Sequence, residues 1–274
     1  MYIRKPAVAG QFYQADSIKL AKEIDLHLKN ADVSLDADLI AVISPHAGYV
    51  FSGPVAGVAY AAARNRTFDS VIVFAPSHRY RIPGASVIET GKYRTPLRDT
   101  EIDSTLAASL IDGELFIFSP DIHETEHSLE VQVPFIQTIY PDLPLVPIVV
   151  GTTSYDICLK MGKRVADTVI EHSRKPLIVI STDMSHYLSY EQAIETDKKL
   201  CDALETADTL EIKKVIESGT SSACGYGSII AGMTAAQMLG ANECRILDYR
   251  NSGDTAGPKT QVVGYCAAAI TKEQ

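Results

Sequence analysis

The sequence has no apolar run that approaches the roughly 20 residues needed to span a lipid bilayer. Its first residues, MYIRKPAVAGQFYQADS, also lack the apolar stretch of a signal peptide. The five cysteines are dispersed and form no Cys-x-x-Cys pair, a distribution typical of reduced thiols in a cytosol-like compartment. These absences predict a soluble, cytoplasmic protein that has no membrane partner.

An excess of basic residues is missing as well. The 25 Lys and Arg residues stand against 34 Asp and Glu, which gives a net charge of -9. A nucleic acid is therefore not expected as a partner, since no surplus of cations could displace its counterions. The phosphate-binding loop, the strand-linked G-x-G-x-x-G and the G-x-S-x-G nucleophile elbow are all absent from the sequence, so nucleotide binding and serine hydrolase chemistry have no support.

What the chain does have is an alternation of short β-branched runs with helical patterns. The predicted strands cover residues 39–44, 71–75, 145–150, 177–181, 244–249 and 262–268. The predicted helices cover residues 17–30, 55–63, 100–110, 131–140, 155–172, 190–204 and 229–239, with a further helix opening at Asp208. This pattern predicts an α/β fold with a mainly parallel central sheet flanked by helices, to which residues 85–90 add an antiparallel element. Because no long linker or repeat interrupts the chain, residues 1–274 are expected to form a single domain.

Three of the predicted strands lead directly to histidines. Residues 39–44 are followed by His46, residues 71–75 by His78, and residues 177–181 by Asp183 and His186. Ligands of open α/β sheets bind outside the carboxyl ends of the parallel strands. A single histidine at such a place is more often structural, but three at equivalent places favour a shared site on one rim of the sheet.

Cys224 is a fourth candidate for this site. It lies in SSACGYG, residues 221–227, just before or within the first turn of the predicted helix 229–239. A helix N-terminus favours the thiolate, which is both a metal ligand and a nucleophile, and the glycines around Tyr226 let the backbone approach a ligand. The alternative is a small buried thiol. The other cysteines are assigned to the core: Cys158, Cys201, Cys244 and Cys266.

Residues 123–127, HETEH, match the H-E-x-x-H motif of zinc proteases. The further ligands of those enzymes are missing, since no Glu occurs between Glu130 and Glu171 and the metzincin extension is absent. Pro120 also makes an uninterrupted helix through His123 doubtful. We therefore expect Glu126, His127 and Glu130 to line the rim of the site, and His123 and Glu124 to be ordinary exposed charge.

Taken together, these segments resemble the Memo family of cytosolic α/β proteins. The matching segments are AGQFY at 9–13, PHAGY at 45–49 with Ser52-Gly53, PSH at 76–78, EHSLEVQ at 126–132, STDMSH at 181–186 and Cys224-Gly225. They occur in order through nearly the whole chain. The resemblance implies a fold related to class III extradiol ring-cleaving dioxygenases, which hold non-haem Fe(II) with two histidines and a carboxylate.

The resemblance also implies roles for individual residues. His46, His78 and Cys224 are implied as metal ligands, so that a thiolate stands where the dioxygenases have a carboxylate. Asp183 and His186 are implied as catalytic residues beside the metal, with His186 moving protons and Asp183 orienting it.

Tyr49, Glu126 and His127 are expected to shape the substrate pocket. Iron, copper and zinc all suit the soft ligand set, with iron as the first expectation. The function implied is that of a metal-binding protein with a dioxygenase-like pocket, acting as an oxidoreductase on a small-molecule or peptide ligand. Two other functions stay open: a binding module without turnover, and a metal-dependent hydrolase. The microbial relatives imply a radical-SAM partner protein.

Overall fold

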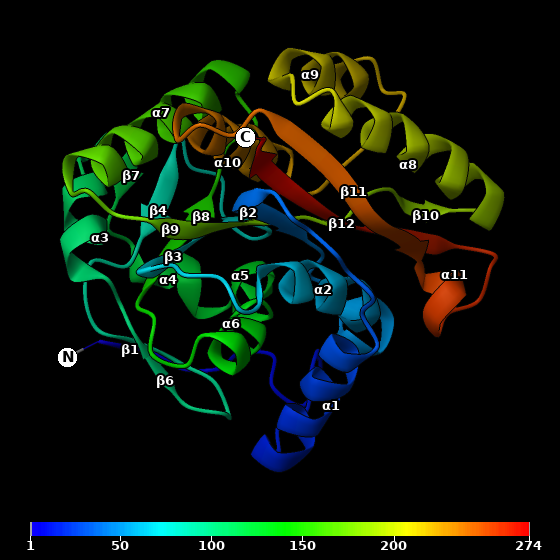
Figure 1. Ribbon diagram of the computed structural model, residues 1–274, viewed down its shortest axis with the longest axis horizontal. Helices are drawn as coiled ribbons and strands as arrows, with labels where there is room; N and C mark the ends of the chain where they lie inside the picture. Colours follow the sequence, from blue (N-terminus) through cyan, green and yellow to red (C-terminus); the bar gives the residue numbers. More distant parts are fainter. Residues whose placement is uncertain (1, 274) are drawn as a thin grey trace.

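A nine-stranded sheet forms the centre of the computed structural model, which describes residues 2–273 (Figure 1). From one edge its strands are β10 (His186–Leu188), β12 (Val262–Lys272), β2 (Asp38–Ser44), β9 (Pro176–Ser181), β3 (Ser70–Pro76), β8 (Leu145–Val150), β4 (Ala85–Val87) and β7 (Phe116–Ile117), with β11 (Glu243–Asn251) paired to β12. The second sheet has three strands, in the order β1 (Ile3–Arg4), β5 (Lys92–Arg94) and β6 (Asp99–Glu101).

The middle of the large sheet is parallel, as the sequence predicted. Strands β2, β9, β3 and β8 pair in parallel with unbroken register, so their carboxyl ends lie at one edge. The outer pairs are mixed: β12 runs antiparallel to β2, and β4 antiparallel to β8 but parallel to β7. Residues 85–90 thus supply the expected antiparallel strand, although it pairs with distant segments. Every residue of β3, β8 and β9 is buried, which explains why these strands are continuous apolar runs rather than alternating ones.

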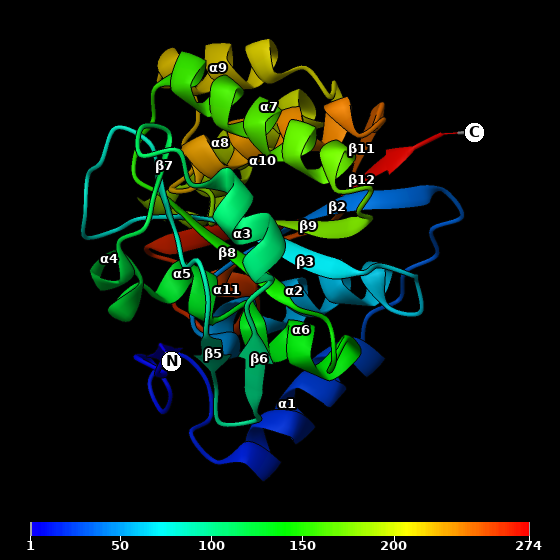
Figure 2. The ribbon, with the colours of Figure 1, turned by 90° about the vertical axis from the view of Figure 1, so that its left-hand side faces the viewer.

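Helices cover both faces of the sheet (Figure 2). On one face α7 (Tyr155–Glu171) and α10 (Tyr226–Met238) pack against each other and α10 contacts the central strands, with α3 (Ser104–Leu110), α8 (Tyr190–Glu205) and α9 (Thr209–Glu217) on the same side. On the other face lie α1 (Ser17–Lys29), α2 (Tyr49–Ala63) and α6 (Val133–Ile139). The remaining short helices are α4 (Pro120–Glu124), α5 (His127–Glu130) and α11 (Ser252–Thr255).

Several helix ends follow from local sequence signals. The capping box between Ser189 and Gln192 opens α8, and the Asp208 side chain accepts the N–H of Leu210 at the start of α9. Helix α2 begins at Tyr49 rather than at residue 55, and α10 begins at Tyr226 rather than at residue 229. Both candidate ligands His46 and Cys224 therefore lie in the few residues that precede a helix.

The N-terminal segment is fixed to the core by Glu130. This carboxylate is fully buried and forms an ion pair with the equally buried Arg4. It also accepts hydrogen bonds from the N–H groups of Ala7 (2.8 Å) and Val8 (3.0 Å) and from the hydroxyl of Tyr13 (2.6 Å). The prediction that Glu130 lines the rim of the site is wrong, because its partners from residues 4–13 enclose it in the core.

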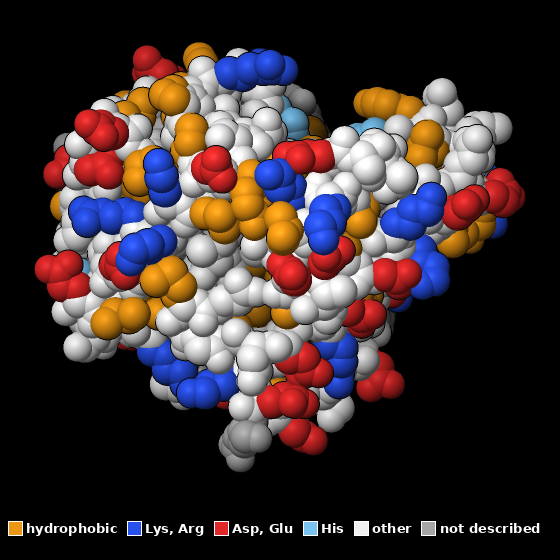
Figure 3. All heavy atoms as spheres, turned by 90° about the horizontal axis from the view of Figure 1, so that it is seen from above, with side chains coloured by type: hydrophobic (Ala, Val, Ile, Leu, Met, Phe, Trp, Pro, Cys, Tyr) orange, Lys and Arg blue, Asp and Glu red, His pale blue; other side chains and the backbone are white. Residues whose placement is uncertain are grey.

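The surface carries charges of both signs. Figure 3 shows the side of the molecule on which α7 and α9 lie, and acidic and basic side chains are interspersed over it. Within residues 2–273, no helix combines the length and the hydropathy that a bilayer crossing requires.

Candidate metal centre

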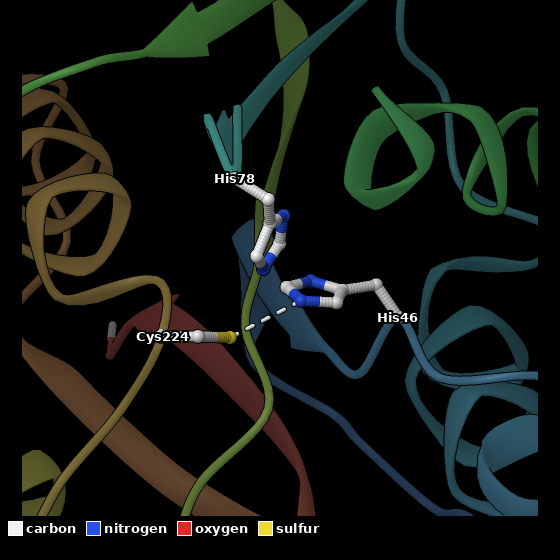
Figure 4. A group of neighbouring side chains, drawn as sticks. All are labelled: His46, His78 and Cys224. Atoms are coloured by element: carbon white, nitrogen blue, oxygen red, sulfur yellow. Dashed lines mark hydrogen bonds between the residues drawn. The ribbon is translucent and has the colours of Figure 1, made fainter. Parts of the chain in front are cut away.

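Two imidazoles and a thiol meet at the carboxyl edge of the parallel strands. His46 follows β2, His78 follows β3, and Cys224 precedes α10 (Figure 4). One ligand atom from each lies within 4.8 Å of the others, and the Sγ atom of Cys224 is 3.1 Å from Nε2 of His46. The three residues predicted as metal ligands thus converge on one point.

The ring of His46 presents a bare nitrogen to this point. Its Nδ1 atom lies 2.9 Å from the hydroxyl oxygen of Ser181, and that hydroxyl donates its own hydrogen to the carbonyl oxygen of Ser128 at 2.7 Å. Because the hydroxyl can then only accept, Nδ1 of His46 carries the proton and Nε2 keeps its lone pair. Burial, with neighbouring His127, lowers the pKa of His46 well below its ordinary value, so the ring is neutral.

The ring of His78 is oriented by Glu126. The carboxylate of Glu126 accepts the Nδ1–H of His78 at 2.9 Å and its backbone N–H at 2.7 Å, and it also accepts the N–H of Ser128 at 2.9 Å. Burial alone would favour the neutral acid, but these hydrogen bonds lower the pKa of Glu126 to about 2. An ionised carboxylate that holds Nδ1–H leaves Nε2 of His78 free to bind a metal, which is the usual outer-shell arrangement of metal-bound histidines. Glu126 therefore positions a candidate ligand.

The thiol of Cys224 is protonated in the absence of a cation. Burial, followed by the charge of Asp183, raises its pKa. The expectation that the helix N-terminus would favour the thiolate is therefore wrong for the metal-free protein, because the removal of the sulfur from water outweighs the helix dipole. A metal ion would displace this proton, since only the thiolate is a metal ligand.

His127 adds a third imidazole to the same region. Its ring centroid is 4.5 Å from that of His78 and 5.5 Å from that of His46. Its ring can also form a second ligand group with His78 and Glu126. Since both oxygens of Glu126 already accept hydrogen bonds, the group that contains Cys224 has the freer donor atoms. Burial lowers the pKa of His127 to about 4, so the ring is neutral beside the other two.

Asp183 and His186 do not contact each other in the way that the sequence suggested. Asp183 is buried and its Oδ1 atom accepts the backbone N–H of His46 at 2.7 Å, which fixes the loop that carries this candidate ligand. Burial raises the pKa of Asp183 to about 7. His186 is exposed, and its Nδ1–H donates to the carbonyl oxygen of Met184 at 2.8 Å. The backbone, rather than Asp183, thus orients the ring of His186 and leaves its Nε2 as an acceptor.

Tyr49 lies in the core rather than in a pocket wall, where it was expected. Only 2% of it is exposed, its hydroxyl donates to the carbonyl oxygen of Val131 at 2.6 Å, and its ring packs against Phe135 and Tyr13. The helical turn that begins at Tyr49 directs this side chain into the core, where its hydroxyl joins α2 to the end of α5.

The H-E-x-x-H match does not form a zinc site of the protease type. Its two histidines belong to separate helices, because α4 ends at Glu124 and α5 begins at His127. Glu124 is exposed as expected, but His123 is fully buried, with Nε2 3.2 Å from the hydroxyl of Ser86. The expectation that His123 is exposed was wrong, because α4 packs this ring against β4.

A cavity of about 560 Å³ borders Cys224, and we call it the Arg81 cavity. Its lining residues come from the end of β3, the loop before β4, the end of β8 and the start of α10: Pro76, Ser77, Arg81, Ile82, Pro83, Val150, Gly151, Thr152, Thr153, Cys224, Gly227 and Ser228. The sequence reasoning missed Thr152, Thr153 and Ser228. The rule that singled out the histidines could have found the two threonines, since they follow the fourth parallel strand.

The fold and the site define an α/β protein whose parallel strands bring two imidazoles and a thiol to one edge of the sheet, as a group that could hold a metal ion. The family model described as Memo-like protein matches residues 4–269. The chain therefore belongs to the Memo family, which confirms the resemblance seen in its motifs.

Relatives in archaea match along their whole length. A MEMO1 family protein of Methanopyrus kandleri is 35% identical over 281 residues, which cover 98% of this chain and 99% of the relative. Another, from Aeropyrum pernix, is 37% identical over 283 residues, with 98% and 100% covered. Among solved structures, the uncharacterized protein JW3007 from Escherichia coli K12 is similar with a TM-score of 0.54 at 14% identity, over 85% of this chain and 99% of that chain. This last similarity supports the α/β fold alone.

Proposed function

We propose that the protein binds one redox-active metal ion, iron in the first place, and acts as a non-haem oxidoreductase on a small-molecule substrate. The observation that carries the proposal is the convergence of His46, His78 and Cys224 within 4.8 Å. The donor set fits a metal, because each imidazole has its Nδ1–H held by a hydrogen-bond acceptor, so its Nε2 can point its lone pair at the same place.

The thiol favours a soft or borderline metal. Two imidazoles and a thiolate suit iron, copper or zinc, whereas magnesium and calcium take oxygen ligands. Three protein ligands leave coordination positions open, which is the arrangement of a catalytic rather than a closed structural site. When bound, such a metal supplies redox chemistry and a place for substrate to coordinate.

The surrounding residues supply proton chemistry. The Nε2 atom of His186 is bare because Nδ1–H donates to a backbone carbonyl, and the partial removal of this ring from water lowers its pKa. His186 can therefore accept a proton from a substrate hydroxyl at neutral pH. His127 is neutral as well, and its ring lies beside those of His78 and His46. Glu126 stays ionised and keeps His78 in place while protons move elsewhere.

The test is purification without oxygen, with elemental analysis of the wild-type protein and of a variant that carries both His46→Ala and Cys224→Ser. We expect about one iron per wild-type chain and none in the double variant, with Cys158→Ser as a control that removes a thiol from the core rather than from the site. Oxygen consumption with a series of catechols then tests turnover. A double variant that still holds one tightly bound ion would rule out the ligand set. If the protein instead binds zinc and hydrolyses esters or amides without taking up oxygen, its function would be that of a hydrolase rather than an oxidoreductase.

A further inference from the structure

The Arg81 cavity has a size and a charge that suit a small anionic molecule. Its volume of about 560 Å³ lies within the range of small-molecule sites. Arg81 is the one charged residue among the residues that line it. None of the ion pairs formed within residues 2–273 includes Arg81, so its exposed guanidinium has no carboxylate partner there.

The N-terminal end of α10 contributes to the same cavity. The N–H groups of Tyr226 and Ile229 bond to backbone carbonyl oxygens at 3.3 and 2.8 Å. Those of Gly227 and Ser228, which lie between them and line the cavity, have no hydrogen-bond acceptor within residues 2–273. Free N–H groups in the first turn of a 13-residue helix, together with the positive end of its dipole, attract anions.

The side chain of Ser228 is a second and independent observation. The residue is fully buried, and its hydroxyl oxygen has no hydrogen-bond partner within residues 2–273. Buried hydroxyl groups without partners are rare in folded proteins, and each asks for an explanation. Because Ser228 lines the cavity, a small shift of its side chain would let this hydroxyl donate its hydrogen bond to an oxygen atom of a ligand there.

Gly227 brings the helix end close to the exit of β8. A Cβ atom on Gly227 would lie 2.3 Å from the carbonyl oxygen of Thr152, so only glycine allows this approach. The hydroxyl oxygen of Thr152 accepts the N–H of Ser154 at 3.2 Å, which leaves its own hydrogen free to donate. A guanidinium, two backbone N–H groups and the hydroxyls of Ser228 and Thr152 therefore surround one cavity that lacks an acidic residue.

We propose that the Arg81 cavity binds an oxyanion group of the substrate, a carboxylate or a phosphate, through Arg81, the first-turn N–H groups of α10 and the hydroxyl of Ser228. The inference rests on the proposed function in one respect: Cys224 borders the cavity, so the rest of the bound molecule lies next to the metal. The substrate class is then a small organic acid or a phosphorylated small molecule.

Anion binding can be measured on metal-free protein, which separates this inference from the proposed function. Inorganic phosphate and benzoate are titrated into ¹⁵N-labelled, chelator-treated protein, and the amide signals of Gly227 and Ser228 are followed. We expect a saturable shift of both signals with at least one of the two anions. The anion that binds more tightly identifies the group as phosphate or carboxylate.

Three variants test the contacts. Arg81→Gln and Ser228→Ala should each weaken binding, the first by about tenfold or more because it removes a charge-assisted hydrogen bond. Arg79→Gln is the matched control, since Arg79 is an exposed arginine two positions away that does not line the cavity, and it should leave the affinity unchanged.

Two results would overturn the inference: neither anion shifts the two amide signals, or Arg81→Gln and Arg79→Gln weaken binding equally. If either result is obtained with a protein that still binds one metal ion per chain, the proposed function stands. If anions bind with the expected variant effects but the protein takes up no metal, the anion site in the Arg81 cavity would be supported and the proposed oxidoreductase function would be contradicted.

Discussion

The Sγ atom of Cys224 lies 3.1 Å from Nε2 of His46, although 178 positions separate the two residues in the chain. The contact forms because β2 lies in the parallel centre of the sheet and α10 packs against its neighbours, so that the loop before the helix reaches the carboxyl edge of the strands. In the metal-free state the protonated thiol can donate its hydrogen to the bare Nε2 of His46, and the carbonyl oxygen of Asp183 at 3.6 Å is its other acceptor. A metal ion would take the place of that hydrogen.

The first prediction concerns the thiolate ligand. Cobalt(II) added to the metal-free protein should produce the absorption of thiolate-to-cobalt charge transfer, because Cys224 loses its proton when it binds a metal. In Cys224→Ser this absorption should be absent while the weaker ligand-field bands persist. Cys158→Ser is the control, since Cys158 is buried outside the ligand group and should leave the spectrum unchanged. An unchanged charge-transfer band in Cys224→Ser would exclude this sulfur as a ligand.

A second prediction concerns the carboxylate behind His78. Glu126→Gln removes the charge that holds Nδ1–H of His78, so metal affinity should fall by about 10- to 100-fold, as for other carboxylates behind metal-bound histidines. Competition with a chromogenic chelator measures the change. Glu124→Gln alters an exposed glutamate two positions away and should have no effect. Equal affinities in the two variants would show that Glu126 does not position the ligand.

The third prediction concerns the buried ion pair of the core. Glu130→Ala leaves Arg4 charged and buried without its partner, and it also removes the acceptor for Tyr13. The free energy of unfolding, measured by urea denaturation, should fall by about 3–5 kcal/mol. Glu124→Ala should change it by less than about 0.5 kcal/mol, since that residue is exposed. A fall of similar size in both variants would contradict the structural role of Glu130.

The fourth prediction is a pH dependence that arises from His123. Burial lowers the pKa of this histidine to about 3, from about 6.5 in the unfolded chain. Between these values the unfolded chain binds more protons than the folded protein, so the stability that the neutral ring provides is lost as the pH falls from 6.5 toward 3. One such group gives a slope of up to about 1.4 kcal/mol per pH unit.

The variant His123→Phe tests this slope. Its free energy of unfolding should depend less steeply on pH between 4 and 6.5 than that of the wild-type protein, whatever constant offset the substitution causes. Parallel curves for the two proteins would show that His123 does not contribute to the loss of stability in acid.

Most of the central architecture could be predicted from local patterns. The apolar runs at β3, β8 and β9 are buried on both faces, and that of β2 is buried except for the partly exposed Ile40. An uninterrupted apolar run rich in β-branched residues is what such a buried strand requires. The starts of α2 and α10 were placed too late, because the residues that open them, from Tyr49 and from Tyr226, include glycines and serines that have low helix propensity. Their helical conformation depends on tertiary packing.

The candidate site, too, could be predicted from the sequence only in part. His46 and His78 could be found from the sequence because the exit of a parallel strand leads to a known edge of the sheet. The orienting role of Glu126, the packing of the His127 ring beside those of His46 and His78, and the burial of Tyr49 could not be found, since each depends on contacts between segments 30 or more positions apart.

The sequence by itself determined the fold class, the family and the group of three candidate ligands, because strand patterns and ordered motifs are local properties of the chain. Only the tertiary structure decided the electrostatic state of the site. The helix N-terminus near Cys224 favours a thiolate, but the pKa of the thiol is raised because the folded chain removes the sulfur from water. The tertiary structure likewise placed Arg81, Ser228 and Thr152 around one cavity, because no local pattern encodes which loops meet at the edge of a sheet.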